Sequence, residues 1–347
     1  MSITNRNSTA DLAKGIALLL IIQVHLTEVF AETSFYEGLL GKISLFLGGP
    51  PVAPVYMLIM GYFIAASRRS FLLLIRRGVT ILAVAFFLNL ALNFHLLLRI
   101  WKKAVDINPW NYVFGVDILF LAGFSILILA ALKPFFKNKW YLYLTLAVCV
   151  AWAAPGLNRL LIVNGSAAYF LAFFGGDFWW SYFPLFPWLA YPLLGCGIYR
   201  LNKQYPETFE SRSVQLYSIP AIVIILMFWI KFGVSTSVTL DDYYHHGLQF
   251  FLWTVLFLAL WFTIIHLVET NIPQNLLNSY FQWLGRNIII AYIAQWLLIG
   301  NIGTALYKTQ SLPQLIIWNL LILVLSSLLV FLFLLMRRQI ISHLKNA

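Results

Sequence analysis

Long apolar runs, separated by short polar or turn-rich stretches, dominate the pattern of this chain. A run of about 20 apolar residues is the length that an α-helix needs to cross the hydrocarbon core of a bilayer. We predict ten such spans, at residues 12–30, 51–66, 78–98, 112–132, 140–155, 182–200, 214–232, 248–269, 283–300 and 312–336. The pattern therefore predicts an all-α fold, a polytopic bundle of transmembrane helices.

Two further stretches are only moderately apolar. Residues 156–178 contain Arg159 and Asn164, so we interpret them as a re-entrant or outward-lying segment, with an eleventh span as the alternative. Residues 34–50 are predicted to form a short outer helix that ends at the turn beginning with Gly48. Neither a linker nor an internal repeat divides the chain, which predicts a single membrane domain over residues 1–347.

Composition and charge agree with a membrane protein. The chain is 61% hydrophobic and 10% charged, whereas about a quarter of the residues of a soluble domain are charged. Of its 23 Lys and Arg residues, 15 fall in segments on one side of the predicted spans, 7 on the other and Arg286 within a span. The positive-inside rule then places both termini in the cytoplasm, and we expect a multi-pass protein of the plasma (inner) membrane.

The net charge of +11 does not indicate nucleic-acid binding, because the basic residues lie at the ends of the spans instead of on one soluble face. Membrane lipids with anionic headgroups and an anionic cytosolic ligand are the expected partners. Cys, His and carboxylate residues show no spacing typical of a zinc or iron site, so no metal is expected. The sequence indicates no particular oligomeric state.

The first span carries ionisable residues at membrane depth. Asp11 and Lys14 lie near its start, and His25 follows Lys14 by eleven residues, about 16 Å further along a helix. Ionisable groups at that depth are costly and usually mark a pathway or a reaction site. His25 is therefore a candidate proton acceptor, with a hydrogen-bonded core histidine as the alternative. Glu28 lies three residues on, where it would orient His25 or face the outer vestibule.

The stretch Asp11-Leu-Ala-Lys-Gly-Ile-Ala17, with its apolar run and His25, resembles the opening helix of the acyltransferase-3 family. These proteins are membrane-bound acyltransferases that modify glycans. Lys14 stands where that family has arginine, which keeps the charge but loses the planar fork. The resemblance implies transfer of an acyl group, most simply acetyl, from acyl-CoA to a lipid-linked sugar or surface glycan. His25 would be the general base, with an acyl carrier as the alternative, and Asp11 and Lys14 would steady the coenzyme.

The segment Met60-Gly-Tyr-Phe-Ile64 and the arginines after it resemble a second stretch of that family. Guanidinium groups bind phosphates through paired hydrogen bonds, and coenzyme A carries phosphates. We therefore predict a coenzyme site at four arginines within ten residues, Arg68, Arg69, Arg76 and Arg77. The alternative is that they only encode topology.

A late stretch, which begins Leu284-Gly-Arg-Asn287, resembles a third part of the family. Asn287 and Gln295 replace a serine and a histidine there, and both still form hydrogen bonds. We predict that Arg286 and Asn287 line the cytosolic entrance and contribute to coenzyme binding.

The segment from Tyr182 to Gly195 contains three prolines, which interrupt a helix and predict an irregular entry beside a cavity. Its Phe-Pro-Trp and Leu-Leu-Gly motifs resemble those of heparan-α-glucosaminide N-acetyltransferase-like proteins. We predict acceptor binding by Asp177, Trp179, Trp180 and Tyr182, whose aromatic rings would form a floor for a sugar. The alternative is an aromatic belt at the membrane interface.

Three alternatives remain open at this point. The run Asp241-Asp-Tyr-Tyr-His-His246 is interpreted as a solvated outer loop, with contact to an acceptor or a metal as the alternative. A transporter of a lipid-linked sugar or a small anion would equally use buried ionisable residues and broken helices. A catalytically idle relative that senses or scaffolds is the third.

Overall fold

The computed structural model describes residues 7–161, 163–206 and 212–346. Throughout these ranges the regular elements are helices, and the β-type pairings are two isolated bridges, Ala31 with Gln310 and Val116 with Ser181. The prediction of an all-α fold is confirmed. Arg6, one of the basic residues counted on the cytoplasmic side, lies outside the described residues.

Eight helices within the described residues are long and apolar enough to cross a membrane. They are Ser8–Val29, Leu39–Ala66, Phe71–Leu92, Ile118–Phe136, Trp140–Leu160, Leu248–Asn271, Ile288–Leu306 and Leu312–His343. A ninth results if the pair Tyr217–Phe228 and Ile230–Val238, bent by 64°, forms one span. Each of the eight overlaps a predicted span, so the chain is a multi-pass membrane protein.

Two of the ten predicted spans are interrupted. Residues 182–200 contain α11 (Leu185–Trp188) and α12 (Ala190–Gln204), and Phe186 has non-helical backbone angles. The prolines of this segment break the helix as predicted, which leaves α12 with 15 residues, fewer than the roughly 20 that cross a bilayer. Residues 214–232 are likewise divided between α14 (Arg212–Phe228) and α15 (Ile230–Val238).

The two moderately apolar stretches contain short helices. Within 156–178, the described residues form the end of α9 (Trp140–Leu160) and the helix α10 (Ser166–Leu171), neither of which adds a span. Residues 34–50 lie in α2 (Thr33–Glu37) and α3 (Leu39–Gly48). Contrary to the prediction of a separate outer helix, α3 is part of the candidate span Leu39–Ala66. The helix α3 ends at the glycine that begins the predicted turn.

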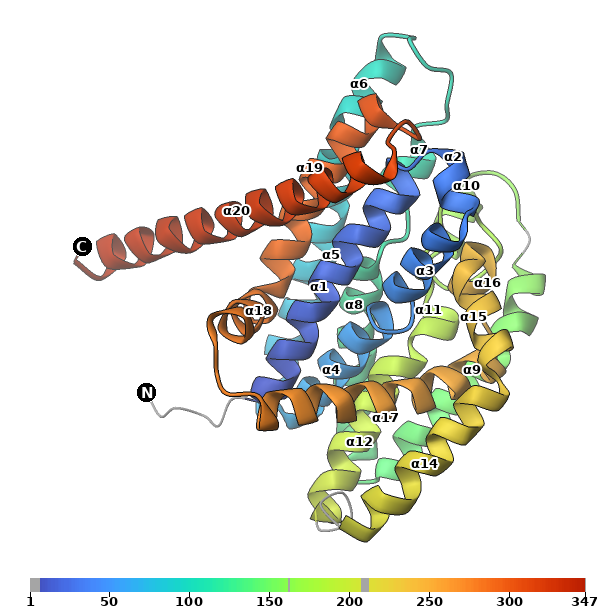
Figure 1. The fold of residues 1–347 in the computed structure, drawn as a ribbon, viewed down its shortest axis with the longest axis vertical. Coiled ribbons are helices and arrows are strands. Elements are labelled where there is room, and N and C mark those ends of the chain that lie inside the picture. The colour runs from blue at the N-terminus through green and yellow to red at the C-terminus, as the bar shows by residue number, and fades with distance from the viewer. Residues whose placement is uncertain (1–6, 162, 207–211, 347) are drawn as a thin grey trace. The chain divides into compact units, whose positions relative to one another are not determined.

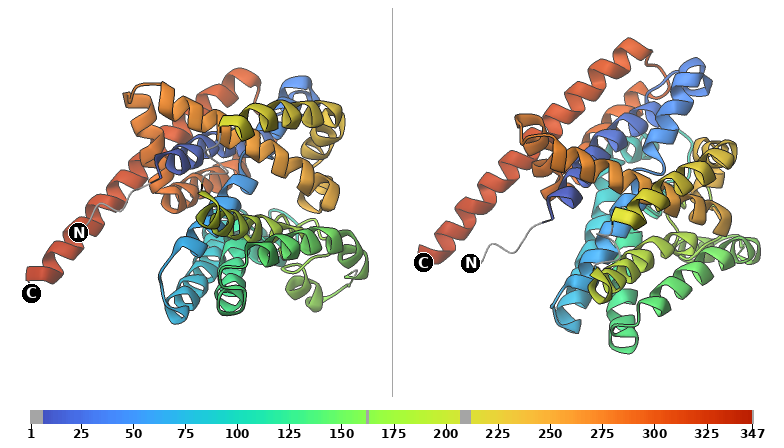
Figure 2. Two further views of the ribbon diagram at one scale, coloured as in Figure 1. Left: turned by 90° about the horizontal axis from the view of Figure 1, so that it is seen from below. Right: turned by 60° about the horizontal axis from the view of Figure 1, so that its bottom comes forward.

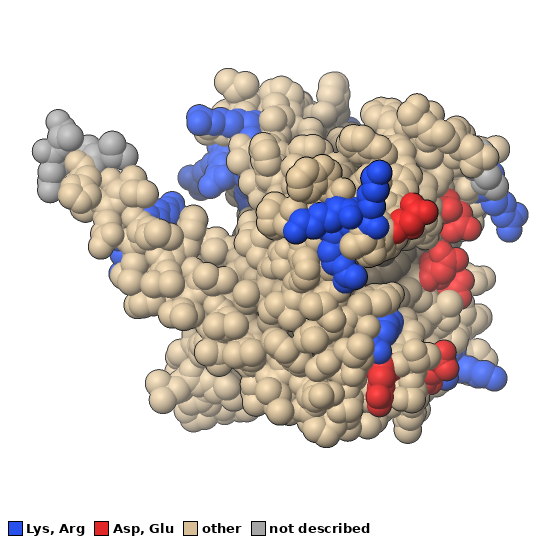
Figure 3. Space-filling view, turned by 90° about the horizontal axis from the view of Figure 1, so that it is seen from above, with Lys and Arg blue, Asp and Glu red and all other residues tan. Residues whose placement is uncertain are grey.

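Apolar side chains are exposed along the candidate spans. On α20 (Leu312–Asn346), for example, Val324 and Phe331 are exposed by 62% and 51%. Figure 3 shows charged side chains in small groups on a surface that is otherwise uncharged. Exposed apolar surface of this extent is unfavourable in water but is covered by lipid in a bilayer.

The chain divides into two compact units, of which the first comprises Met1–Gly48, Ala91–Val105 and Ile264–Ala347. Its central helix is α1 (Ser8–Val29), which packs against α3, α18 (Leu276–Arg286), α19 (Ile288–Leu306) and α20 (Figure 1). The helix α6 (Phe94–Trp101) packs on α19. The C-terminal part of α20 extends beyond α1 and α19 (Figures 1 and 2).

Close packing of α1 against α18 depends on two glycines. A Cβ atom on Gly15 would overlap the backbone of Phe281, and one on Gly285 would overlap the carbonyl oxygen of Asp11. Small residues let the two backbones approach in this way, which is a common arrangement between membrane helices. The contact fixes the end of α1 that carries Asp11 and Lys14.

The second unit comprises Gly49–Leu90 and Asp106–Thr263. In its core, α12 packs against α4 (Ala53–Ala66), α9 and α11. The helix α8 (Ile118–Phe136) packs against α4, α9 and α11. The helices α5 (Phe71–Leu92) and α17 (Leu248–Asn271) contribute residues to both units. Two short helices, α7 (Trp110–Val113) and α16 (Leu240–Tyr244), lie in connecting segments of the second unit.

Candidate functional site

His25 lies near the C-terminal end of α1, between two buried neighbours, Val24 and Leu26. Its own side chain is only partly buried. The ring stacks on Trp296, with 3.9 Å between the ring centroids and 32° between the planes. Its Nδ1 atom lies 3.2 Å from Oε1 of Gln295. His25 is therefore held by two consecutive residues of α19.

This hydrogen bond defines which ring nitrogen carries the proton. An amide oxygen only accepts, so Nδ1 of His25 donates to Oε1 of Gln295. The other nitrogen, Nε2, then has a lone pair and is the atom that can take a proton. Gln295 is fully buried, and its own Nε2 has no partner among the described residues.

Gln295 was not among the predicted site residues. Its signal in the sequence was its position in the late helix, where the resembling family has histidine. The sequence did not show that this amide reaches His25, because 270 positions separate the two residues.

The other predicted residues of α1 have partners of their own. Lys14 Nζ donates to Asp11 Oδ1 at 2.8 Å, three residues apart on one helix face. Glu28 interacts electrostatically with Lys308, whose Nζ lies 3.8 Å from the centroid of the Tyr36 ring. Burial lowers the pKa of Lys308, and the Glu28 carboxylate opposes that shift. Glu28 therefore interacts with the loop between α19 and α20, and Gln295 is the residue bonded to His25.

The four arginines predicted to bind coenzyme A lie at the start of α5 and in the turn before it. Arg68, Arg69 and Arg76 are exposed, and Arg77 is close enough to Arg69 for their charges to interact. Among the described residues none of the four forms an ion pair with a carboxylate. Lys133 lies beside this arginine segment, because its Nζ donates to the carbonyl of Ser67 at 2.6 Å. The arrangement offers guanidinium donors to an anionic ligand.

Arg286 and Asn287 lie in the other compact unit, at the junction of α18 and α19. Arg286 is exposed, and Asn287 Nδ2 donates to the carbonyl of Trp283 at 2.9 Å. Asn287 thus terminates α18. The exposed guanidinium of Arg286 is able to bind an anion at this junction.

An open cavity of about 1130 Å³ lies in the second unit. Its wall comes from two segments, residues 108–114 around α7 and residues 163–180 around α10. Three of the predicted acceptor residues, Asp177, Trp179 and Trp180, belong to this wall. Tyr182 is not part of it and packs instead against Tyr244, with ring centroids 5.3 Å apart.

Backbone hydrogen bonds join the two segments. The Val116 amide donates to the Trp180 carbonyl at 2.8 Å, and the Tyr182 amide donates to the Val116 carbonyl at 3.1 Å. Gly176, at a φ of +94°, provides the turn that leads into this pairing. The two tryptophans are thereby fixed beside α7, an arrangement that the sequence alone did not predict.

A second open cavity, of about 850 Å³, contains a group that could hold a metal ion. One ligand atom each from Asp177, Asp241 and His245 lies within 4.8 Å of the others. Burial and the nearby Asp177 carboxylate raise the pKa of Asp241, and burial lowers the pKa of His245 against the pull of both carboxylates. Exposed acidic groups often gather without an ion, and we assign none to this group.

His246 is a buried residue whose two ring nitrogens are both hydrogen-bonded. Its Nδ1 donates to the Tyr243 carbonyl at 2.7 Å, so its Nε2 accepts from the Tyr191 hydroxyl at 2.9 Å. Burial lowers the pKa of His246 to about 4. Residues 241–246 were interpreted from the sequence as a solvated loop, but 241–244 belong to the short helix α16. The segment has exposed carboxylates and a buried His246.

The helices of membrane-spanning length in the described part of the chain define a multi-pass integral membrane protein. A family model described as an acyltransferase domain, of the acyltransferase-3 type, matches residues 7–336. The chain belongs to this family and is a membrane acyltransferase. A search of curated proteins finds no match to it.

Proposed function

We propose that this protein transfers an acyl group, acetyl in the simplest case, from acyl-CoA to a glycan or lipid-linked sugar, with His25 as general base. The observation that carries the proposal is the Nδ1–Gln295 hydrogen bond, which leaves Nε2 of His25 free to accept a proton. Family membership supplies the reaction class, and the imidazole supplies a group that can accept a proton and return it.

In the proposed reaction the acceptor hydroxyl attacks the thioester carbonyl while His25 Nε2 removes its proton. The new C–O bond forms, the C–S bond breaks, and the leaving thiolate of coenzyme A takes the proton back from His25. Gln295 keeps the ring in one orientation during both transfers, and Trp296 supports its face. Asp11 and Lys14 are proposed to steady the coenzyme from the start of α1.

Coenzyme binding is proposed at Arg68, Arg69, Arg76 and Arg77, with Arg286 and Asn287 as further contacts. The support is the absence of carboxylate partners for the four arginines within the described part of the chain. Guanidinium groups in this state are available for the phosphates of the coenzyme.

The experiment that tests the function uses the full chain in proteoliposomes with radiolabelled acetyl-CoA and a lipid-linked sugar fraction. We expect label to appear on the sugar. Uptake of sugar or coenzyme into the vesicles without any acylation would contradict the proposal and would favour transport.

A further inference from the structure

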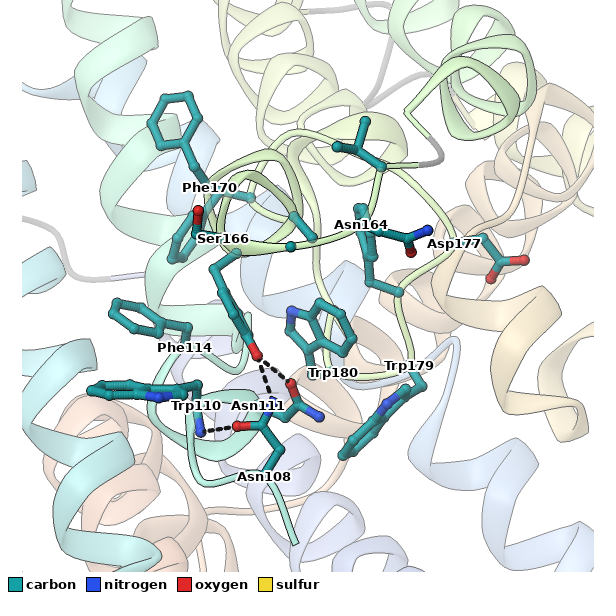
Figure 4. Close-up of a pocket in the computed structure, with 16 residues that line it drawn as sticks. Asn108, Trp110, Asn111, Phe114, Asn164, Ser166, Phe170, Asp177, Trp179 and Trp180 are labelled. Carbon is teal, nitrogen blue, oxygen red and sulfur yellow. Dashed lines mark hydrogen bonds between the residues drawn. The ribbon is translucent and has the colours of Figure 1, made fainter.

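The aromatic cavity of the second unit has features that specify its ligand. Its volume of about 1130 Å³ is slightly above the usual range for small-molecule sites, roughly 300–1,000 Å³. Trp110 and Trp179 are both 55% exposed and lie on opposite sides of the group in Figure 4, with the amides Asn108 and Asn111 between them. An interface belt would present rings to lipid, whereas here two indoles flank polar side chains.

Those polar side chains form a connected relay. Asn108 Nδ2 donates to the Tyr169 hydroxyl at 2.9 Å, and that hydroxyl donates to Asn111 Oδ1 at 3.1 Å. Asn108 Oδ1 accepts from the Trp110 amide at 3.1 Å, which fixes the orientation of its carboxamide. Within the described structure, Asn111 uses its Oδ1 in this network, so its side-chain N–H groups are available to donate to a ligand.

Trp180 provides another donor. Its Nε1 is buried, and no acceptor for it is present among the described residues. A buried donor without a partner is unfavourable, so an acceptor oxygen from a ligand would stabilise it. Figure 4 places this indole between Asn164 and Asn111. The cavity thus combines aromatic faces with donors directed at oxygen atoms.

The charge of the wall excludes one class of ligand. Its described residues include no Lys, Arg or His, and Asp177 is the one charged residue among them. A phosphate or carboxylate would find no counter-charge among these residues. A neutral ring with hydroxyl or acetamide oxygens satisfies the donors, and its C–H groups suit the negative faces of the indoles.

We propose that this cavity binds a neutral pyranoside, which stacks on Trp110 and Trp179 and is hydrogen-bonded by Asn111 and Trp180, with Tyr169 holding the amides in place. This deepens the proposed function, since it assigns the acceptor its chemical class and a place of binding. It also names Asn108, Trp110, Asn111 and Tyr169, which the sequence did not single out. Any phosphate of a lipid-linked sugar would lie outside the cavity.

The test is direct binding to the full chain in nanodiscs without an acyl donor, so that its outcome is independent of catalysis. Methyl β-glucopyranoside and methyl N-acetylglucosaminide are titrated by calorimetry, with methyl glucuronide as the anionic comparison. We expect saturable binding of at least one neutral glycoside and at least fivefold weaker binding of the glucuronide. Absence of saturable neutral binding, or equal affinity for the glucuronide, overturns the proposal.

Variants locate the binding. Trp179→Ala should weaken binding of the neutral glycoside at least tenfold, and the conservative Tyr169→Phe should weaken it about fivefold. The matched control is Trp101→Ala, because Trp101 is 78% exposed on α6 and lies outside this cavity; it should bind as the unaltered chain does. Unchanged affinity in both cavity variants overturns the proposal. Acyl transfer measured separately decides the enzymatic function, so a failed cavity and a failed enzyme are distinguishable.

Discussion

Nδ1 of His25 and Oε1 of Gln295 lie 3.2 Å apart, although the two residues are separated by 270 positions. The first span and the late helix α19 are therefore joined at the one residue proposed to move a proton. Because the amide oxygen accepts the Nδ1 proton, the lone pair is on Nε2. Loss of the amide would allow the ring to rotate and the proton to move to Nε2.

Gln295→Ala should lower kcat about tenfold and leave KM nearly unchanged, since Gln295 orients the base without touching the substrate. A hydrogen bond of about 0.5–1.5 kcal/mol corresponds to a rate factor of up to about ten. Gln295→Glu keeps an oxygen acceptor for Nδ1 and should retain more activity than the alanine variant. Steady-state kinetics checks both. Equal kcat in all three proteins would show that Gln295 only fills space.

Arg76→Ala combined with Arg77→Ala should raise the dissociation constant for coenzyme A at least about tenfold. Each charge-assisted hydrogen bond contributes about 1.5–3 kcal/mol. The control pair is Arg337→Ala with Arg338→Ala, which removes the same charge from exposed positions of α20. Calorimetry with coenzyme A gives both constants, and equal affinity in the two double variants would move the phosphate site elsewhere.

His246 should make the protein less stable in acid. Its pKa of about 4 in the folded state lies below the ordinary 6.5 because burial disfavours the charged ring. Between these values the unfolded chain binds a proton that the folded chain does not. Stability is therefore complete above pH 6.5 and falls as the pH drops towards 4, by at most about 1.4 kcal/mol per pH unit.

The measurement is the thermal unfolding midpoint at pH 7.5 and at pH 5 for the unaltered chain and for His246→Gln. Other groups titrate in both proteins, so the difference between them isolates this histidine. We expect the variant to lose less stability on acidification. The same loss in both would mean that His246 is not the buried group responsible.

Gly285→Ala should destabilise the first unit, because its new methyl group would overlap the carbonyl oxygen of Asp11. Overpacking of this kind is unfavourable by about 1–3 kcal/mol. Gly156→Ala is the control, since no atom lies within 4 Å of a Cβ at that helical position. Thermal unfolding should show a lower midpoint for the first variant and an unchanged or higher one for the second. Equal midpoints would show that α1 and α18 can move apart freely.

The sequence predicted the helices well because hydropathy alone defines a membrane span. Residues 182–200 were predicted both as a span and as a segment interrupted by its prolines, and the interruption is confirmed at Phe186. The Asp11–Lys14 pair was predictable since its spacing is local. Orientation and the count of ten spans remain predictions.

Contacts between distant segments account for what the sequence did not show. The sequences of α1 and α19 did not indicate that Gln295 is hydrogen-bonded to His25. They also did not indicate that Glu28 interacts with Lys308 and not with His25. The cavity likewise depends on the pairing of Val116 with Trp180 and Tyr182, backbone bonds that carry no sequence signature. Tyr182 was grouped with its tryptophan neighbours, yet it faces Tyr244.

The central claim is that His25 accepts the proton of the acceptor hydroxyl. The most direct measurement compares transfer from radiolabelled acetyl-CoA to glycan by the unaltered chain, His25→Ala and, as a matched control, His343→Ala in the exposed end of α20. We predict loss of about 10²–10⁴-fold in the His25 variant, with its thermal unfolding and coenzyme affinity retained, and full transfer by the control. Undiminished transfer by His25→Ala would contradict the mechanism.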